Sequence, residues 1–304
     1  MATLLISLPV FLIILSGWLM RKLKIVDDDW IHILNSFAYY VSLPALIIVS
    51  FWEINFLSAE SRHFIFSSIF TIILFSFVVL LFLSFLRISK NKKTAIFLSA
   101  TVGNTIYMGL PLIELGFGKD YLSSGALVGV IYLIIPLLIS IFVIRYWHDK
   151  EHKVLRHLFK FAKNPLVISV FIGVILSFVR IEFSLIEGIR KALVMFGSTA
   201  SPIALFALGG FIYGRFLKKN LKQVLLISFL KMVVAPLIIF LIVAYFYKTS
   251  DLRILVLLSS MPVAITTFII AEKFNLDKDL VGNSIIVSTI ISFIIAPIII
   301  FIFS

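Results

Sequence analysis

The chain has 304 residues, of which 61% are hydrophobic and 14% charged, with a mean hydropathy of +1.15. Nearly its whole length must form apolar spans, which excludes a soluble domain of any size and indicates one polytopic membrane domain. The net charge of +12 lies in short connections, where it orients spans against an anionic membrane surface, so nucleic-acid binding is not expected. Since there is no cysteine, disulfides, thiol nucleophiles and cysteine-bound metals are excluded.

Apolar runs long enough to cross about 30 Å at helical rise predict ten transmembrane helices. Nineteen of the 27 Lys and Arg residues fall in or beside the connections after odd-numbered spans, seven fall on the other side, and Lys231 alone lies inside a span. By the positive-inside rule this bias places both termini on the outer side of the membrane. The predicted spans cover approximately residues 3–20, 31–51, 64–86, 94–117, 122–146, 165–180, 191–214, 223–246, 252–271 and 280–303.

The longest predicted connection, residues 148–164, separates a first repeat of five helices (1–147) from a second one (165–304). Apolar and basic residues alternate along it at helical spacing, which predicts an interfacial helix on the cytoplasmic surface. Asn164 followed by Pro165 is typical of a helix N-terminus, so the sixth span begins there.

Prolines recur at matching places in the two halves, which indicates an internal duplication. Because five spans per half is an odd number, the halves enter the membrane from opposite sides, and inverted repeats are typical of secondary transporters. The matched pairs are Pro44 with Pro202, Pro111 with Pro262, and Pro136 with Pro297.

Two spans carry residues that a plain membrane helix does not tolerate. The fourth contains a polar, glycine-rich stretch from Gly103 to Pro111, and the ninth contains Ser259-Ser260-Met261-Pro262 followed by Thr266-Thr267. Helix-breaking residues at membrane depth free backbone groups that only protein or a watery cavity can satisfy, so both stretches predict helix breaks that form a site. The amino ends of the broken halves suit an anion, and the carbonyl ends suit Na⁺.

These breaks are the predicted substrate site. The Asn104 amide can donate hydrogen bonds to a carboxylate. A lone ammonium inside a span, such as Lys231, is costly unless it faces the protein interior, so it either attracts the anion or replaces a coupling cation. The alternatives are that the polar groups only satisfy freed backbone, and that Lys231 reaches the headgroups along its stem. The predicted site residues are Gly103, Asn104, Thr105, Pro111, Ser259, Pro262, Thr266, Thr267 and Lys231.

Other polar residues have simpler interpretations. Glu114 lies near the outer end of its span, as an interfacial carboxylate does, although it could reach a substrate vestibule. The run Asp27-Asp28-Asp29 is expected to cap the second span. His148 and His152 are four residues apart, a possible ligand spacing, but lie in a basic connection, so no metal is assigned. An enzyme is not expected, since no Cys or paired carboxylate lies in the spans.

The sequence resembles the auxin efflux carrier family in its bacterial branch. The most specific match is the stretch from Gly103 to Leu112, and the resemblance covers both halves of the chain. The further matching pieces are Met261-Pro262-Val263-Ala264, Leu43-Pro44-Ala45-Leu46, Lys163-Asn164-Pro165-Leu166 and the region from Pro202 to Gly210.

The resemblance implies the architecture shared by plant PIN carriers and bile-acid sodium symporters. Spans one, two, six and seven would form a scaffold, and the other six a moving core whose fourth and ninth spans cross at their proline breaks. It implies a permease of the bacterial cytoplasmic membrane that moves a small organic anion, such as malate or malonate, by elevator-type alternating access.

The same resemblance implies a homodimer through the scaffold helices and no cofactor. Coupling to H⁺ or Na⁺ is left open, because no acidic residue lies beside the crossover while carbonyl, Asn, Ser or Thr oxygens alone can hold Na⁺. The alternatives are a sodium-coupled symporter of the bile-acid type and a passive channel or sensor on the same fold.

Overall fold

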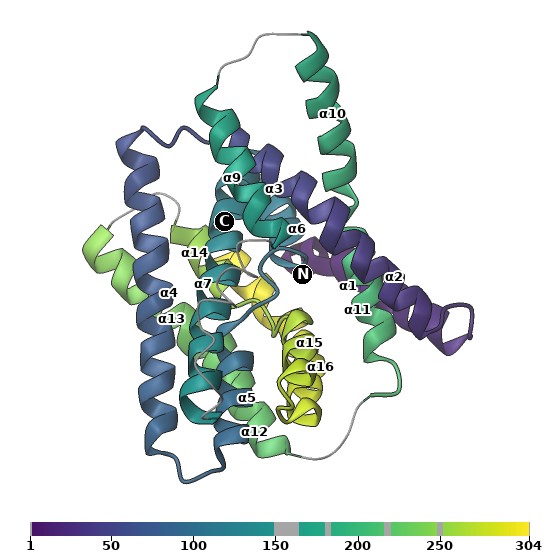
Figure 1. Cartoon of the computed structure of the whole chain (residues 1–304), viewed down its shortest axis with the longest axis vertical. Helices are drawn as coiled ribbons and strands as arrows, with labels where there is room; N and C mark the ends of the chain where they lie inside the picture. Colours follow the sequence, from purple (N-terminus) through teal and green to yellow (C-terminus); the bar gives the residue numbers. More distant parts are fainter. Residues whose placement is uncertain (1, 149–163, 180–183, 216–219, 248–251, 304) are drawn as a thin grey trace.

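The computed structural model describes residues 2–148, 164–179, 184–215, 220–247 and 252–303 (Figure 1). The interfacial helix expected over residues 148–164 therefore lies almost wholly outside them. All regular elements in the described ranges are helical, and seven stretches are long and apolar enough to cross a membrane. The chain is thus an all-α, multi-pass membrane protein.

The described elements are all helices. In chain order they are α1 (Ala2–Lys22), α2 (Asp28–Phe37), η1 (Ala38–Ser42), α3 (Leu43–Trp52), α4 (Ala59–Phe85), α5 (Lys90–Thr101), α6 (Gly109–Phe117), η2 (Lys119–Tyr121), α7 (Leu122–His148), α9 (Pro165–Phe178), α10 (Ser184–Ser198), α11 (Ala200–Ile212), α12 (Leu221–Phe229), η3 (Leu230–Val234), α13 (Ala235–Ile242), η4 (Val243–Tyr247), α14 (Leu252–Ser259), α15 (Thr266–Lys273) and α16 (Lys278–Phe303).

Two predicted helix starts are confirmed by their capping hydrogen bonds. The Asp27 carboxylate accepts from the Trp30 N–H at 2.9 Å, which fixes the start of α2. Asn164 Oδ1 accepts from the Leu166 N–H at 2.9 Å, and Pro165 takes the first position of α9. Both caps satisfy N–H groups that a helix start leaves unpaired.

Two spans contain a π-helical turn immediately before a proline. In η1 the N–H of Leu43 donates to the carbonyl of Ala38, five residues back, and the next residue is Pro44. In η3 the N–H of Ala235 makes the equivalent bond, and Pro236 follows. Because proline has no N–H, the regular hydrogen-bond ladder cannot continue, and a widened turn accommodates the gap. The first of these turns carries Tyr39, which lines the candidate site, and the second carries Lys231, which lies behind it.

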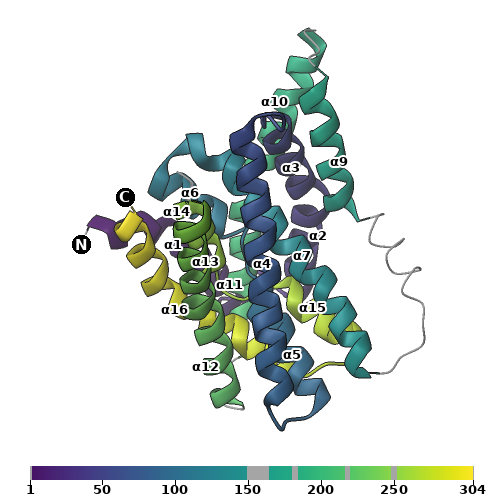
Figure 2. The same ribbon diagram turned by 90° about the vertical axis from the view of Figure 1, so that its left-hand side faces the viewer.

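The helices pack in two groups. The first contains α1 along α11 and α3 along α9 and α10; the second contains α4 and α5 on α7, α13 on α14, and α12 along α16 (Figures 1 and 2). The groups touch where α1 meets α16 and α3 meets α7. The approach of α1 to α11 is closest at two glycines, since a Cβ at Gly17 or Gly209 would lie 1.9 Å from a carbonyl oxygen of the facing helix.

Two helices stop and resume within the bundle. Helix α5 ends at Thr101 and α6 begins at Gly109, and we call residues 102–108 the first break. Helix α14 ends at Ser259 and α15 begins at Thr266, and we call residues 260–265 the second break. Both interruptions lie in the stretches where the sequence predicts them.

Candidate functional site

The two breaks cross through their backbones. Gly103 of the first break lies opposite Val263 of the second in an antiparallel bridge. A crossing of this kind pairs backbone groups that the missing helical turns leave free, which is what a hydrocarbon environment requires. The bridging bonds run from Asn104 N–H to Pro262 O at 2.7 Å and from Ala264 N–H to Val102 O at 3.2 Å.

The first break is further tied to its surroundings by hydrogen bonds. The Asn104 carbonyl accepts from the N–H groups of Met108 at 3.3 Å and Gly109 at 3.2 Å. The Thr105 hydroxyl donates to the Gly129 carbonyl of α7 at 2.8 Å. The side-chain amide of Asn104 is different: only 5% of the residue is exposed, yet this amide has no hydrogen-bond partner in the described part of the chain. It is therefore available to a ligand.

Hydroxyl groups hold the second break. The Val263 N–H donates to Ser288 Oγ of α16 at 3.0 Å. The hydroxyls of Ser259, Ser260 and Thr267 each donate to a backbone carbonyl three residues earlier, at 2.6–2.7 Å. These three hydroxyls therefore make local hydrogen bonds to carbonyls that also accept a backbone N–H.

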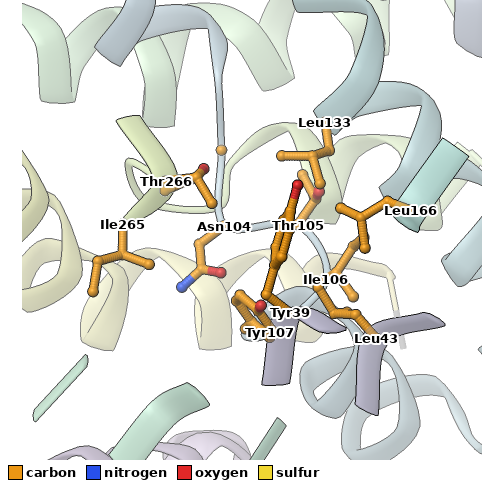
Figure 3. A pocket seen from close by; sticks show the side chains of 12 residues that line it. Tyr39, Leu43, Asn104, Thr105, Ile106, Tyr107, Leu133, Leu166, Ile265 and Thr266 are labelled. Carbon is orange, nitrogen blue, oxygen red and sulfur yellow. The ribbon is translucent and has the colours of Figure 1, made fainter. Parts of the chain in front are cut away.

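A cavity of about 20 Å³ lies at the crossing, with room for a water molecule or two (Figure 3). Besides the Asn104 amide it contains Thr266, whose Oγ1 is buried without a partner among the described residues. Tyr39 and Tyr107 form part of its wall. The lining residues, none of which is acidic or basic, are Tyr39, Leu43, Gly103, Asn104, Thr105, Ile106, Tyr107, Leu133, Leu166, Ala264, Ile265 and Thr266.

Helix α15 begins at this cavity. Thr266 is its first residue, and Ile265 in the capping position offers no side-chain cap. Helix α6 begins two residues after Tyr107, also without a side-chain cap. The first N–H groups of both helices already donate to nearby backbone carbonyls, as those of Thr267 in α15 and Gly109 in α6 do. The dipole of each helix start still favours negative charge, and no cationic side chain lines the cavity.

Lys231 lies behind the first break and not in the cavity. The residue is fully buried, and its ammonium donates to the Thr101 carbonyl at 3.4 Å. It packs against Gly103, where a Cβ would lie 2.8 Å from Lys231 Nζ. The alternative that this side chain reaches the headgroups is therefore wrong, since the whole residue is enclosed by protein.

The predicted site residues divide into two sets. Those that line the cavity are Gly103, Asn104, Thr105 and Thr266. Those that lie outside it are Pro111, Ser259, Pro262, Thr267 and Lys231.

The position of Pro111 corrects one expectation. The chain crosses at Gly103 and Val263, directly after Pro262, whereas Pro111 is the third residue of α6. A proline is tolerated there because the N–H groups of a first helical turn have no partner within the helix.

Several wall residues were not predicted. Tyr39 and Leu166 come from the second and sixth spans and reach the cavity through tertiary packing. Pro44 was a usable signal for Tyr39, since the π turn that precedes it carries this side chain. Glu114 instead faces outward, with its side chain 41% exposed and its Oε1 3.9 Å from Lys119 Nζ. No cluster of His, Asp and Glu able to hold a metal occurs in the described ranges, which do not include His152.

Two broken helices that cross inside a membrane-spanning bundle are the arrangement typical of a secondary transporter. Residues 5–300 match the family described as membrane transport protein. The chain therefore belongs to this family, the auxin efflux carrier family that its sequence resembles.

Similar proteins cover nearly the whole chain. An uncharacterized transporter of Methanocaldococcus jannaschii is 23% identical over 297 residues, 95% of each chain. A putative malonate transporter of Rhizobium meliloti is 24% identical over 296 residues, 94% of this chain and 91% of that one. The lysosomal cholesterol signaling protein of Mus musculus is 26% identical over 310 residues, 94% of this chain but 36% of that protein.

Proposed function

We propose that this protein is a secondary carrier that moves a small organic anion across the bacterial cytoplasmic membrane. The observation that carries the proposal is the Asn104 amide, which has no partner among the described residues and lines a cavity that Thr266, the first residue of α15, also lines. An amide donor, a hydroxyl and a positive helix end together suit a carboxylate group. Malonate is the first anion to test, because a relative is named a putative malonate transporter.

The proposal includes ten transmembrane helices in two inverted repeats. Helices α5 with α6 and α14 with α15 would each form one broken crossing, and α9 a short one, beside the seven long stretches. Contacts between residues at matching positions support the duplication. Ser42 Oγ and Thr199 Oγ1 are 2.7 Å apart and 157 residues apart in sequence, close to the offset of 158 between Pro44 and Pro202. Equivalent residues of two copies meet in this way near a twofold axis.

The composition of the cavity wall supports an elevator mechanism. Tyr39, Leu43 and Leu166 come from the helices assigned to the scaffold, and the remaining wall residues come from those assigned to the core. A cavity of about 20 Å³ holds water but no dicarboxylate, so an anion can bind only if these walls separate. A sliding core would separate them. Termini on the outer side and a homodimer through the scaffold complete the proposal.

Counterflow in proteoliposomes tests the proposed function. Vesicles loaded with unlabelled malonate should briefly concentrate labelled malonate, because a carrier exchanges substrate across the membrane whereas an open channel does not. Malonate entry without counterflow would favour a channel. The absence of counterflow with malonate, malate and indole-3-acetate alike would contradict the organic-anion proposal, and a requirement for Na⁺ would favour the symporter alternative.

A further inference from the structure

The buried ammonium of Lys231 is not used by the anion site described above. Lys231 is fully buried in η3, between α12 and α13, and does not line the cavity. Within the described ranges it forms no ion pair with an acidic side chain. An unpaired charge inside a membrane protein is costly, so we expect the Lys231 ammonium to have a function.

Its contacts show what the ammonium stabilises. Thr101 is the last residue of α5, and its carbonyl, which accepts from Lys231 Nζ at 3.4 Å, belongs to the negative end of that helix. Gly103 allows this approach, because a Cβ there would lie 2.7 Å from Lys231 Cε and 2.8 Å from Nζ. The ammonium therefore lies where the helix end and the crossing backbone concentrate partial negative charge.

The carbonyl end of a broken membrane helix is also a place where carriers coordinate a free monovalent cation. We propose that the Lys231 ammonium is a covalently attached substitute for that cation at the end of α5. The protein then needs no Na⁺ or K⁺ to form the crossing, and removal of the side chain leaves a site that a small free cation can fill. This inference rests on the proposed function for its importance to transport, but the cation site itself can be tested without any transported substrate.

The test is thermal unfolding of the purified full chain in detergent at constant ionic strength. Choline chloride, which is too large for the site, is the reference, and NaCl, KCl and methylammonium chloride are the probes. For Lys231→Ala we expect methylammonium or Na⁺ to raise the midpoint by about 2–4 °C over choline, because a ligand that binds only the folded state stabilises it. Wild type should not respond, since its own ammonium fills the site.

Two further variants separate this inference from a general salt effect. Lys231→Met fills most of the same volume without a charge, so it should not respond to any of the cations. Lys222→Ala removes an exposed lysine from α12, only nine positions away, and should behave as wild type. Equal responses of all four proteins, or no response from Lys231→Ala, would overturn the proposal.

If Lys231→Ala does not fold, the thermal midpoint of the wild-type protein in different salts tests the proposal. A midpoint that is the same in NaCl, KCl and choline chloride supports the proposal, and a specific rise with Na⁺ or K⁺ overturns it. A protein that shows the expected cation responses but no counterflow would contradict the carrier proposal and leave this one intact.

Discussion

The two breaks differ in the groups that donate hydrogen bonds to the carbonyls at the preceding helix end. At the end of α14 the hydroxyls of Ser259 and Ser260 donate to the carbonyls of their own helix at 2.7 Å. At the end of α5 the Thr101 carbonyl instead receives the ammonium of Lys231. The end of α5 has a local hydroxyl bond as well, from Thr101 to the Phe97 carbonyl at 2.8 Å. What distinguishes the first break is the additional contact with Lys231, a charge from a distant span.

The same asymmetry extends to the ligand groups. The first break contributes the unpaired Asn104 amide to the cavity, whereas the second contributes mainly backbone and apolar wall, with Thr266 at the start of α15. We therefore expect the first break to bind the substrate and the second to stabilise the crossing. Substitutions in the first break should therefore reduce transport more than those in the second.

The largest effect is expected from Asn104→Ala. The variant loses a hydrogen bond to a charged carboxylate, worth about 1.5–3 kcal/mol, so initial malonate uptake in proteoliposomes should fall about 10- to 100-fold. The control is Asn35→Ala, which removes a partly buried asparagine of α2 outside the cavity and should transport as wild type. Normal uptake by Asn104→Ala would remove this amide from the substrate site.

The next effect is expected from Gly103→Ala. The added Cβ would meet Lys231 Cε at 2.7 Å and push the ammonium from the Thr101 carbonyl. Crowding of this kind costs about 1–3 kcal/mol, so uptake should fall about tenfold. In the control, Gly282→Ala, the new Cβ has ordinary contacts of 3.4 Å and longer, and uptake should not change. Equal uptake by the two variants would show that the approach of Lys231 does not matter.

Ser288→Ala tests whether the hydrogen bond from Val263 to α16 stabilises the second break. It leaves the buried Val263 N–H without its partner, which should lower the free energy of unfolding by about 1–3 kcal/mol and lower the thermal midpoint. Ser284→Ala is the control one turn away, since that hydroxyl bonds only a carbonyl of its own helix. If both variants lose the same stability, the bond between α16 and the second break is unimportant.

The smallest effect is expected from Ser259→Ala. Its hydroxyl satisfies the Val256 carbonyl and does not line the cavity, so uptake should stay within about twofold of wild type. A loss as large as that of Asn104→Ala would mean that recognition is shared between the two breaks.

The sequence predicted much of this arrangement. The apolar runs, the caps at Asp27 and Asn164, and the two interrupted helices follow from local rules of hydropathy and backbone pairing. The inner walls of the site do not follow from such rules. Tyr39 and Leu166 join the cavity through contacts between distant spans.

Pro111 and Lys231 also show that sequence rules do not predict tertiary contacts. Pro111 and Pro262 look alike as helix-breaking signals, but only tertiary pairing decides that Pro262 lies in the crossing and Pro111 in the first turn of α6. Likewise, the sequence identifies Lys231 as a costly charge but cannot show that its partner is a carbonyl 130 residues away.

Binding of malonate to Asn104→Asp is the most direct test of the anion site at the crossing. The substitution keeps the shape of the side chain and places a negative charge in the cavity, where repulsion of a like charge costs several kcal/mol. Calorimetric titration of the purified, folded proteins should show that the variant binds malonate at least about 100-fold more weakly than wild type. Equal affinity of the two proteins would contradict the assignment of the anion to this cavity.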